Sequence, residues 1–295
     1  MKIASPGVQS LRDSLFLDSF ASNHALTNDD TACIRAEAGA PEVQGGLVAA
    51  FLAWNEKVGT MTTPVRLSAV AFLVLVGWSA RAVADTVQLN PSKDNTLYED
   101  ISGSTSNGQG QHFFVGRTNG GVVRRGLIAF DIASNIPAGS TIQGVTLVLH
   151  VSHVPIGAAE VEIDLHAALA DWGEGASMAA GQEGMGASAA PGDATWLNTF
   201  YPDQLWTAPG GDFLPNITSS AAVSDIGFYT FDSMYDPSLI SDVQQWLDSP
   251  STNFGWGVML GDEFISASAK RFDTRENSVP AFQPLLTVTY APAGE

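Results

Sequence analysis

Apolar and polar residues alternate in several segments beyond residue 120, with the period of two that half-buried β-strands show. Two neighbouring segments would place the following residues on their inward faces: Val145, Leu147, Leu149 and Val151, then Val161, Ile163, Leu165 and Ala167. The water-facing positions of the second segment are Glu160, Glu162, Asp164 and His166. The turn at Pro155-Ile156-Gly157 between the two segments predicts that they form a hairpin.

Three more segments alternate in the same way, and one stretch has helical spacing. The inward-facing strand residues are Gly126, Ile128, Phe130 and Ile132, then Trp256, Val258 and Leu260, then Leu286, Val288 and Tyr290. The helix starts at Pro237 and ends before Pro250, with the apolar stripe Leu239, Ile240, Val243, Trp246 and Leu247. Many short strands without βαβ units predict an all-β fold, an antiparallel jelly-roll β-sandwich over residues 85–291. The alternative is two stacked small sandwiches.

The segment between Gly173 and Ser224 is rich in Gly, Ala, Ser and Pro, yet aromatic residues interrupt it. The aromatic residues in it and at its start are Trp172, Trp196, Phe200, Tyr201, Trp206 and Phe213. A free linker would not carry so many aromatic side chains. We therefore expect a long ordered flap that packs on one face of the sheet, a natural place for function.

Residues 61–84 have the three parts of a signal peptide: a short region with Arg66, an apolar run from Leu67 to Trp78, and Ala82-Val83-Ala84. The run has about 12 residues, whereas a bilayer span takes about 20. We expect cleavage after Ala84 and a secreted, extracellular protein. Translation would start at Met61, with residues 1–60 an upstream translation artefact or a disordered leader. The alternatives are a genuine leader, or a buried strand at 67–76 that packs in the β domain.

The chain is strongly acidic, with 31 Asp and Glu against 13 Lys and Arg and a formal charge of −18. Removal of residues 1–84 takes away seven acidic and six basic residues, so the remaining 211 residues have a formal charge of −17. This charge argues against nucleic acids as partners, because phosphate binding depends on Lys and Arg that release counterions. The one cysteine, Cys33, lies in the part expected to be lost, so neither a disulfide nor a Cys-based zinc site is expected.

Four blocks of sequence together resemble the DNRLRE-domain family. They are KDNTLYED (93–100), RRGLIAFDI (124–132), DVQQWLDSPSTNFGWGVMLGDE (242–263) and KRFDTRE (270–276). DWGEG (171–175) and GDATW (192–196) resemble the flap of a subgroup of that family. The resemblance implies an exported jelly-roll module related to carbohydrate-binding modules for acidic polysaccharides such as alginate. The segment DNTLYE at 94–99 has Thr and Tyr where the family motif has two Arg, which weakens the transfer of ligand contacts.

Six of the seven remaining basic residues fall into two groups: Arg117, Arg124 and Arg125, then Lys270, Arg271 and Arg275. One hypothesis is that both groups grip the carboxylates of an acidic glycan through guanidinium forks. The other is that they pair internally with neighbouring acids, namely Asp94, Glu99, Asp131, Asp273 or Glu276. The flap residues Trp172, Trp196 and Trp206 are candidates for stacking on sugar rings, or they fasten the flap to the sheet.

The histidines give little evidence of a metal site. His150 and His153 are three apart and point to opposite faces of a strand, whereas His150 and His166 could face outward together on neighbouring strands. An exposed polar face is the simpler interpretation of that pair. No loop has the spacing of a calcium site, so no cofactor is expected. The acidic loops nevertheless leave a structural calcium ion as an alternative.

No nucleophile elbow, phosphate-binding loop or zinc-protease motif is present in the sequence. Asp171 and Glu174 could form an acid pair, but a Gly-rich turn is the simpler interpretation. We predict a secreted, non-catalytic module that binds carbohydrate, with an acidic polysaccharide favoured. The alternatives are a purely structural surface module and a polysaccharide lyase or glycoside hydrolase. The oligomeric state does not follow from the sequence.

Overall fold

The computed structural model of the chain describes residues 83–294. The predictions for residues 1–60, for the apolar run at 67–76 and for nearly all of the signal peptide lie outside the described residues. The first strand, β1 (Asp85–Leu89), begins at the residue that follows the predicted cleavage site. Within 83–294, no helix has the length and apolar character that crossing a bilayer requires.

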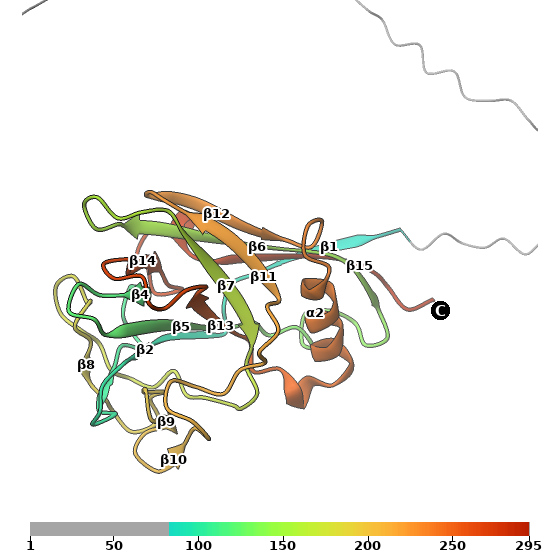
Figure 1. The fold of residues 1–295 in the computed structure, drawn as a ribbon. Helices are drawn as coiled ribbons and strands as arrows, with labels where there is room; N and C mark the ends of the chain where they lie inside the picture. The colour runs from blue at the N-terminus through green and yellow to red at the C-terminus, as the bar shows by residue number, and fades with distance from the viewer. Residues whose placement is uncertain (1–82, 295) are drawn as a thin grey trace, which may run out of the picture. The chain divides into compact units, whose positions relative to one another are not determined.

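The described chain is mostly β-structure, and all of its strand pairs are antiparallel (Figure 1). In the first sheet, β6 (Thr141–His153) pairs along one edge with β15 (Leu285–Ala291) and, further along the strand, with β14 (Lys270–Asp273), and along its other edge with β12 (Gly227–Asp232). β1 extends this sheet beyond β15, and β4 (His112–Arg117) extends it beyond β14. The second has the order β2 (Lys93–Tyr98), β5 (Val123–Ala129), β13 (Trp256–Leu260), β7 (Val161–Ala167) and β11 (Ser219–Val223). Gly116 and Arg117 of β4 also pair with β5, which joins the two into one curled sheet.

One apolar core lies between the two sheets, and the alternating residues point into it. All inward-facing positions predicted for β6, β7, β13 and β15 belong to this core. So do Ile128 of β5 and, just beyond that strand, Phe130 and Ile132. The period of two therefore identified the buried face of each strand, because successive side chains point to opposite sides of a sheet. The mostly-β, sandwich-like architecture is confirmed.

The predicted hairpin between β6 and β7 is wrong. β6 pairs with β12, β14 and β15, whereas β7 pairs with β11 and β13. The chain at Pro155-Ile156-Gly157 passes from one sheet to the other. Both strands face the same core from opposite sides, so each shows the alternation that a hairpin would also show.

The single predicted α-helix is confirmed as α2 (Ser238–Asp248), which covers one end of the sandwich (Figure 1). Pro237 precedes its first residue, and a short 3-10 turn follows at Pro250–Thr252. The side chains of Leu239, Val243, Trp246 and Leu247 are buried in the core. The rings of Trp246 and Trp256 lie 4.6 Å apart between their centres, so both are packing residues, as predicted.

The flap packs on the outer face of the second sheet, as predicted. It contains β8 (Ala187–Ser188), which pairs with β3 (Thr105–Ser106), and the short pair β9 (Asn198–Phe200) and β10 (Gln204–Leu205). A second apolar cluster joins the flap to β2 and β5, and its buried members are Leu97, Leu127, Ala129, Trp172, Ala194 and Trp206. On β13, a methyl group added at Gly257 would come within 2.4 Å of the Phe213 ring. Glycine at this position therefore lets the flap lie against the strand.

Candidate binding groove

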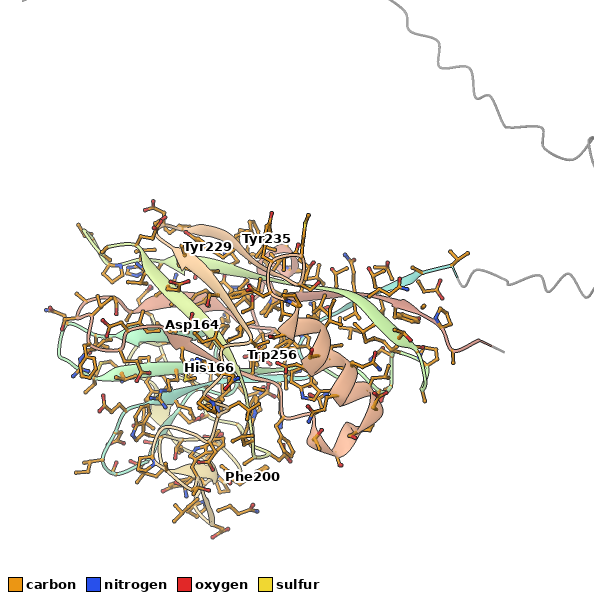
Figure 2. All side chains as sticks on the ribbon, turned by 45° about the vertical axis from the view of Figure 1, so that its right-hand side comes forward. Asp164, His166, Phe200, Tyr229, Tyr235 and Trp256 are labelled. Carbon is orange, nitrogen blue, oxygen red and sulfur yellow. The ribbon has the colours of Figure 1, made fainter. Side chains whose placement is uncertain are left out.

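Polar side chains of β7 form the floor of a groove on the outer face of the second sheet. Asp164 and His166 project from this strand at the centre of the molecule as drawn in Figure 2. Asp164 is buried, and its Oδ1 accepts a hydrogen bond of 2.6 Å from the hydroxyl of Ser220 on β11. The Nδ1 atom of His166 lies 2.9 Å from the carbonyl oxygen of Leu214. Because a carbonyl oxygen only accepts, Nδ1 is the donor in this hydrogen bond.

Two adjoining hollows form the groove, with volumes of about 380 and 410 Å³. They share the lining residues Asp164, Ile217, Gly261 and Asp262, so the floor is continuous from one to the other. Each volume lies in the lower part of the range for small-ligand sites. An open groove of two such hollows suits a chain-like ligand better than a compact one.

An exposed aromatic ring stands at the rim of the first hollow. Phe264, in the loop after β13, is 90% exposed, and Ile217, at the end of the flap, is 50% exposed. Most large apolar side chains of this size are at least partly covered in a folded protein, and an aromatic ring offers a flat apolar face. Phe264 and Ile217 therefore give the groove two exposed apolar contact points beside its carboxylates.

Arg125 and Glu263 close one end of the groove. The guanidinium group binds the carboxylate through two hydrogen bonds, of 2.7 Å from Nε and 2.8 Å from Nη2. It also donates from Nη1 to the main-chain oxygen of Gly210 in the flap, at 2.8 Å, and lies over the ring of Trp196 at 5.1 Å. The cation is thus neutralised and held in place by the protein itself.

The groove as a whole is acidic. Its linings include Glu162, Asp164, Asp262 and Glu263, against the single arginine Arg125. Carboxylate oxygens accept hydrogen bonds from hydroxyl groups and repel other anions. The arrangement can therefore bind a hydroxyl-rich ligand and disfavours a polyanion.

The first predicted basic group does not converge on an open surface. Arg117 donates from Nη1 to the main-chain oxygen of Glu263 at 3.1 Å. Arg124 is 6% exposed, lies over the ring of Tyr98 at 4.7 Å and donates to the main-chain oxygen of Val123. Burial lowers the pKa of Arg124 below its usual value. These residues make internal contacts, as does Arg125.

The second basic group is engaged in the same manner. Lys270 is buried, and its Nζ donates to the main-chain oxygen of Ala159 at 3.2 Å. Arg271 donates to the hydroxyl of Ser152 and to Oε1 of Gln182. These neutral oxygens are partners that the sequence did not indicate, because each lies far from its arginine or lysine along the chain.

Arg275 and Lys93 pair with acids at the start of the flap. Arg275 binds both carboxylate oxygens of Glu174, and its Nε lies 2.8 Å from Oε1 of Glu276. The Nζ atom of Lys93 lies 2.6 Å from Oδ1 of Asp171. The basic residues therefore pair with acids inside the protein, which was one of the two hypotheses from the sequence. Glu276 was among the predicted partners, whereas Glu174, Glu263 and Asp171 were not.

The flap tryptophans lie against the protein. Trp172 and Trp206 are 1% and 5% exposed, and their indole N–H groups donate to the main-chain oxygens of Phe254 and Thr195. Trp196 is partly buried beneath Arg125. All three hold the flap on the sheet, which is the second of the two roles considered for them.

Asp171 and Glu174 do not form an opposed acid pair. Asp171 accepts hydrogen bonds from Lys93 and from the backbone N–H of Trp172 through the same oxygen. Glu174 is held by Arg275 in a two-point contact. Each carboxylate is engaged by its own cation, so the two do not face each other across an open site.

The histidines lie apart, contrary to the shared outward face considered for His150 and His166. Their strands belong to different sheets. His150 is buried, stacks on the ring of Phe282 at 4.1 Å, and places Nδ1 2.5 Å from Oδ2 of Asp273. Nε2 of His112 lies 3.4 Å from the other oxygen of Asp273. Asp273 thus joins two imidazole rings inside the protein.

One set of side chains within 83–294 has the spacing of a metal site. Oxygen atoms of Asp94, Glu174 and Glu276 all lie within 4.8 Å of one another. They come from β2, from the start of the flap and from the loop after β14. The sequence did not reveal this set, because its members are separated by 80 residues or more along the chain.

Sequence reasoning also missed Phe264 and Ile217. The available signal for Phe264 was an aromatic residue within the otherwise polar segment GDEFISAS at 261–268. No protein-family model matches the chain, and a search of curated proteins found no match.

Proposed function

We propose that residues 85–291 form an exported, non-catalytic carbohydrate-binding module of jelly-roll type, related to the DNRLRE-domain family, which holds a glycan chain in the groove over β7 and β13. The observation that carries the proposal is the exposed ring of Phe264 beside the carboxylates of the groove. Sugar rings present apolar C–H faces to aromatic rings and hydroxyl groups to carboxylates.

The groove favours a neutral glycan over the acidic polysaccharide expected from the sequence. Asp164, Asp262 and Glu263 would repel the carboxylates of a polyuronate. The cation of the groove, Arg125, already binds Glu263. An acidic glycan would need open basic residues, and the described ones are engaged in contacts within the protein.

Affinity gel electrophoresis against neutral glucans, alginate and pectin, at low and high salt, tests the proposal. We expect salt-insensitive retardation by a neutral glycan that weakens roughly two- to tenfold in Phe264→Ala, because stacking on an aromatic ring contributes on the order of 0.5–1.5 kcal/mol. Tyr235→Ala is the matched control, since Tyr235 is 80% exposed and does not line the groove. Equal losses in the two variants would contradict the groove.

Other outcomes select the alternatives. Retardation by alginate that disappears in salt and in Arg125→Ala would support an acidic ligand. Absence of retardation by every glycan would favour a purely structural module. Release of reducing ends or unsaturated uronates from a glycan panel, abolished by Asp164→Asn or Glu174→Gln, would overturn the non-catalytic proposal.

A further inference from the structure

The carboxylates of Asp94, Glu174 and Glu276 surround one point where the flap meets both sheets. Asp94 is on β2 of the second sheet, Glu174 is at the start of the flap, and Glu276 follows β14 of the first sheet. Asp94 is fully buried, and Glu174 and Glu276 have side chains that are 14% and 17% exposed. Any group that bound all three would fasten the flap to both sheets.

Two of these carboxylates have an oxygen without a partner. Oδ2 of Asp94 accepts a hydrogen bond of 3.0 Å from the backbone N–H of Arg275, but Oδ1 is buried and has no hydrogen-bond partner among the described residues. The same is true of Oε2 of Glu276. Buried polar atoms nearly always have a partner, so two orphaned oxygens in one cluster indicate a missing ligand.

Glu174 is different, because its oxygens already have donors. Oε1 accepts from the backbone N–H of Asp94 at 3.0 Å and from Nε of Arg275 at 2.7 Å. Oε2 accepts from Nη2 of Arg275 and from Nε2 of Gln109. Glu174 is therefore fixed in position, and it faces Asp94 and Glu276 with its orientation set in advance.

The charges of the cluster do not balance. Three ionised carboxylates and the Arg275 guanidinium leave a net charge of −2 in a largely buried place. Protons or a divalent cation can remove this imbalance.

We propose that Asp94, Glu174 and Glu276 bind one calcium ion, which holds the flap on the sandwich. The donor set consists of carboxylate oxygens alone, which suits a hard cation and not zinc or copper. Calcium accepts irregular arrangements of oxygen ligands, whereas magnesium needs near-octahedral geometry and usually keeps several water molecules. The site is independent of the glycan groove.

Titration calorimetry of the full chain, stripped with EDTA and then mixed with CaCl2, tests the site. We expect one calcium ion per chain, a higher unfolding temperature with calcium, and weaker binding of MgCl2. Glu276→Gln and Asp94→Asn should each lower calcium affinity at least about tenfold, because each removes a charged ligand. Asp171→Asn is the matched control: its carboxylate lies at the same end of the flap but pairs with Lys93.

The outcomes distinguish a bound calcium ion from protonation of the carboxylates as the means by which the charge of the cluster is compensated. If the stripped chain gives no calcium heat and no change in unfolding temperature, the cluster is balanced by protons and the proposal fails. Calcium binding of unchanged affinity in Glu276→Gln places the ion elsewhere and also overturns it. Glu276→Gln decides the matter even if Asp94→Asn does not fold, because Glu276 is partly exposed and its replacement keeps the side-chain shape.

Discussion

The core between the sheets and the contact layer under the flap are built in different ways. Between the sheets, apolar side chains alternate along paired strands, and the strand ladders satisfy the backbone. Under the flap the apolar cluster is small, and buried polar side chains form hydrogen bonds with backbone groups of the flap. Asp193, which is fully buried, accepts hydrogen bonds from the N–H groups of Ala176, Ser177 and Ala190.

The difference follows from the need to satisfy every buried backbone group. A strand meets this need through its neighbours, but an irregular segment has no ladder and must find other acceptors. The side chain of Asn107 supplies such partners under the flap. Its Oδ1 accepts from the N–H of Ala179, and its Nδ2 donates to Glu183 and to the backbone oxygen of His112. Stability should therefore depend on apolar volume in one region and on single polar atoms in the other.

The largest effect is expected in the core between the sheets. Trp256→Ala should lower the free energy of unfolding by about 3–5 kcal/mol, because it leaves a cavity beside Trp246 and Phe130. It also removes the donor of the hydrogen bond to Asp242. Urea unfolding, with the exposed-surface variant Tyr235→Ala as control, measures the loss. Similar values for both variants would contradict the central position of Trp256.

A smaller and local effect is expected under the flap. Asp193→Ala leaves three backbone N–H groups without their acceptor and should cost roughly 2–4 kcal/mol. Asp193→Asn should cost less, because its amide oxygen can still accept from Ala176 and Ser177. Hydrogen exchange should accelerate at the amides of the flap and stay slow in β6. Equal acceleration in both places would show that the flap and the sandwich open as one unit.

The smallest effect concerns acid titration beside the flap. Asp100 accepts hydrogen bonds from Ser102, Ser104 and Thr105, and the bond from the Ser102 side chain is foremost among those that lower its pKa to about 2. A carboxylate with a lowered pKa stabilises the fold above its unfolded value of about 3.8, and this contribution is lost as the pH falls through about 2.

Asp100→Asn should therefore flatten the acid limb of the stability curve between about pH 4 and 2. Urea unfolding at a series of pH values measures the slope of this limb. Leu147→Ala, which removes a buried apolar side chain from the core, should shift the whole curve without changing its slope. An unchanged slope in Asp100→Asn would show that another carboxylate governs this limb.

The sequence alone identified the strands β5, β6, β7, β13 and β15, the buried side of each of them, and where the helix begins and ends. Val145 to Val151 and Val161 to Ala167 are inward-facing because a period of two is a property of one strand by itself. The same property carries no information about the partner strand, so it did not reveal that β6 and β7 lie in different sheets. The aromatic content of the flap was enough to predict that it packs.

Only the tertiary structure decided which charges meet. Arg275 binds Glu174, 101 residues away, and Arg125 binds Glu263, 138 residues away. The tertiary structure also places Phe264, Ile217 and Asp164 around one groove. It brings the carboxylates of Asp94, Glu174 and Glu276 to one point. The physical reason is that alternation reports the exposure of each position to water, whereas an ion pair, groove or metal site depends on the path of the chain between distant segments.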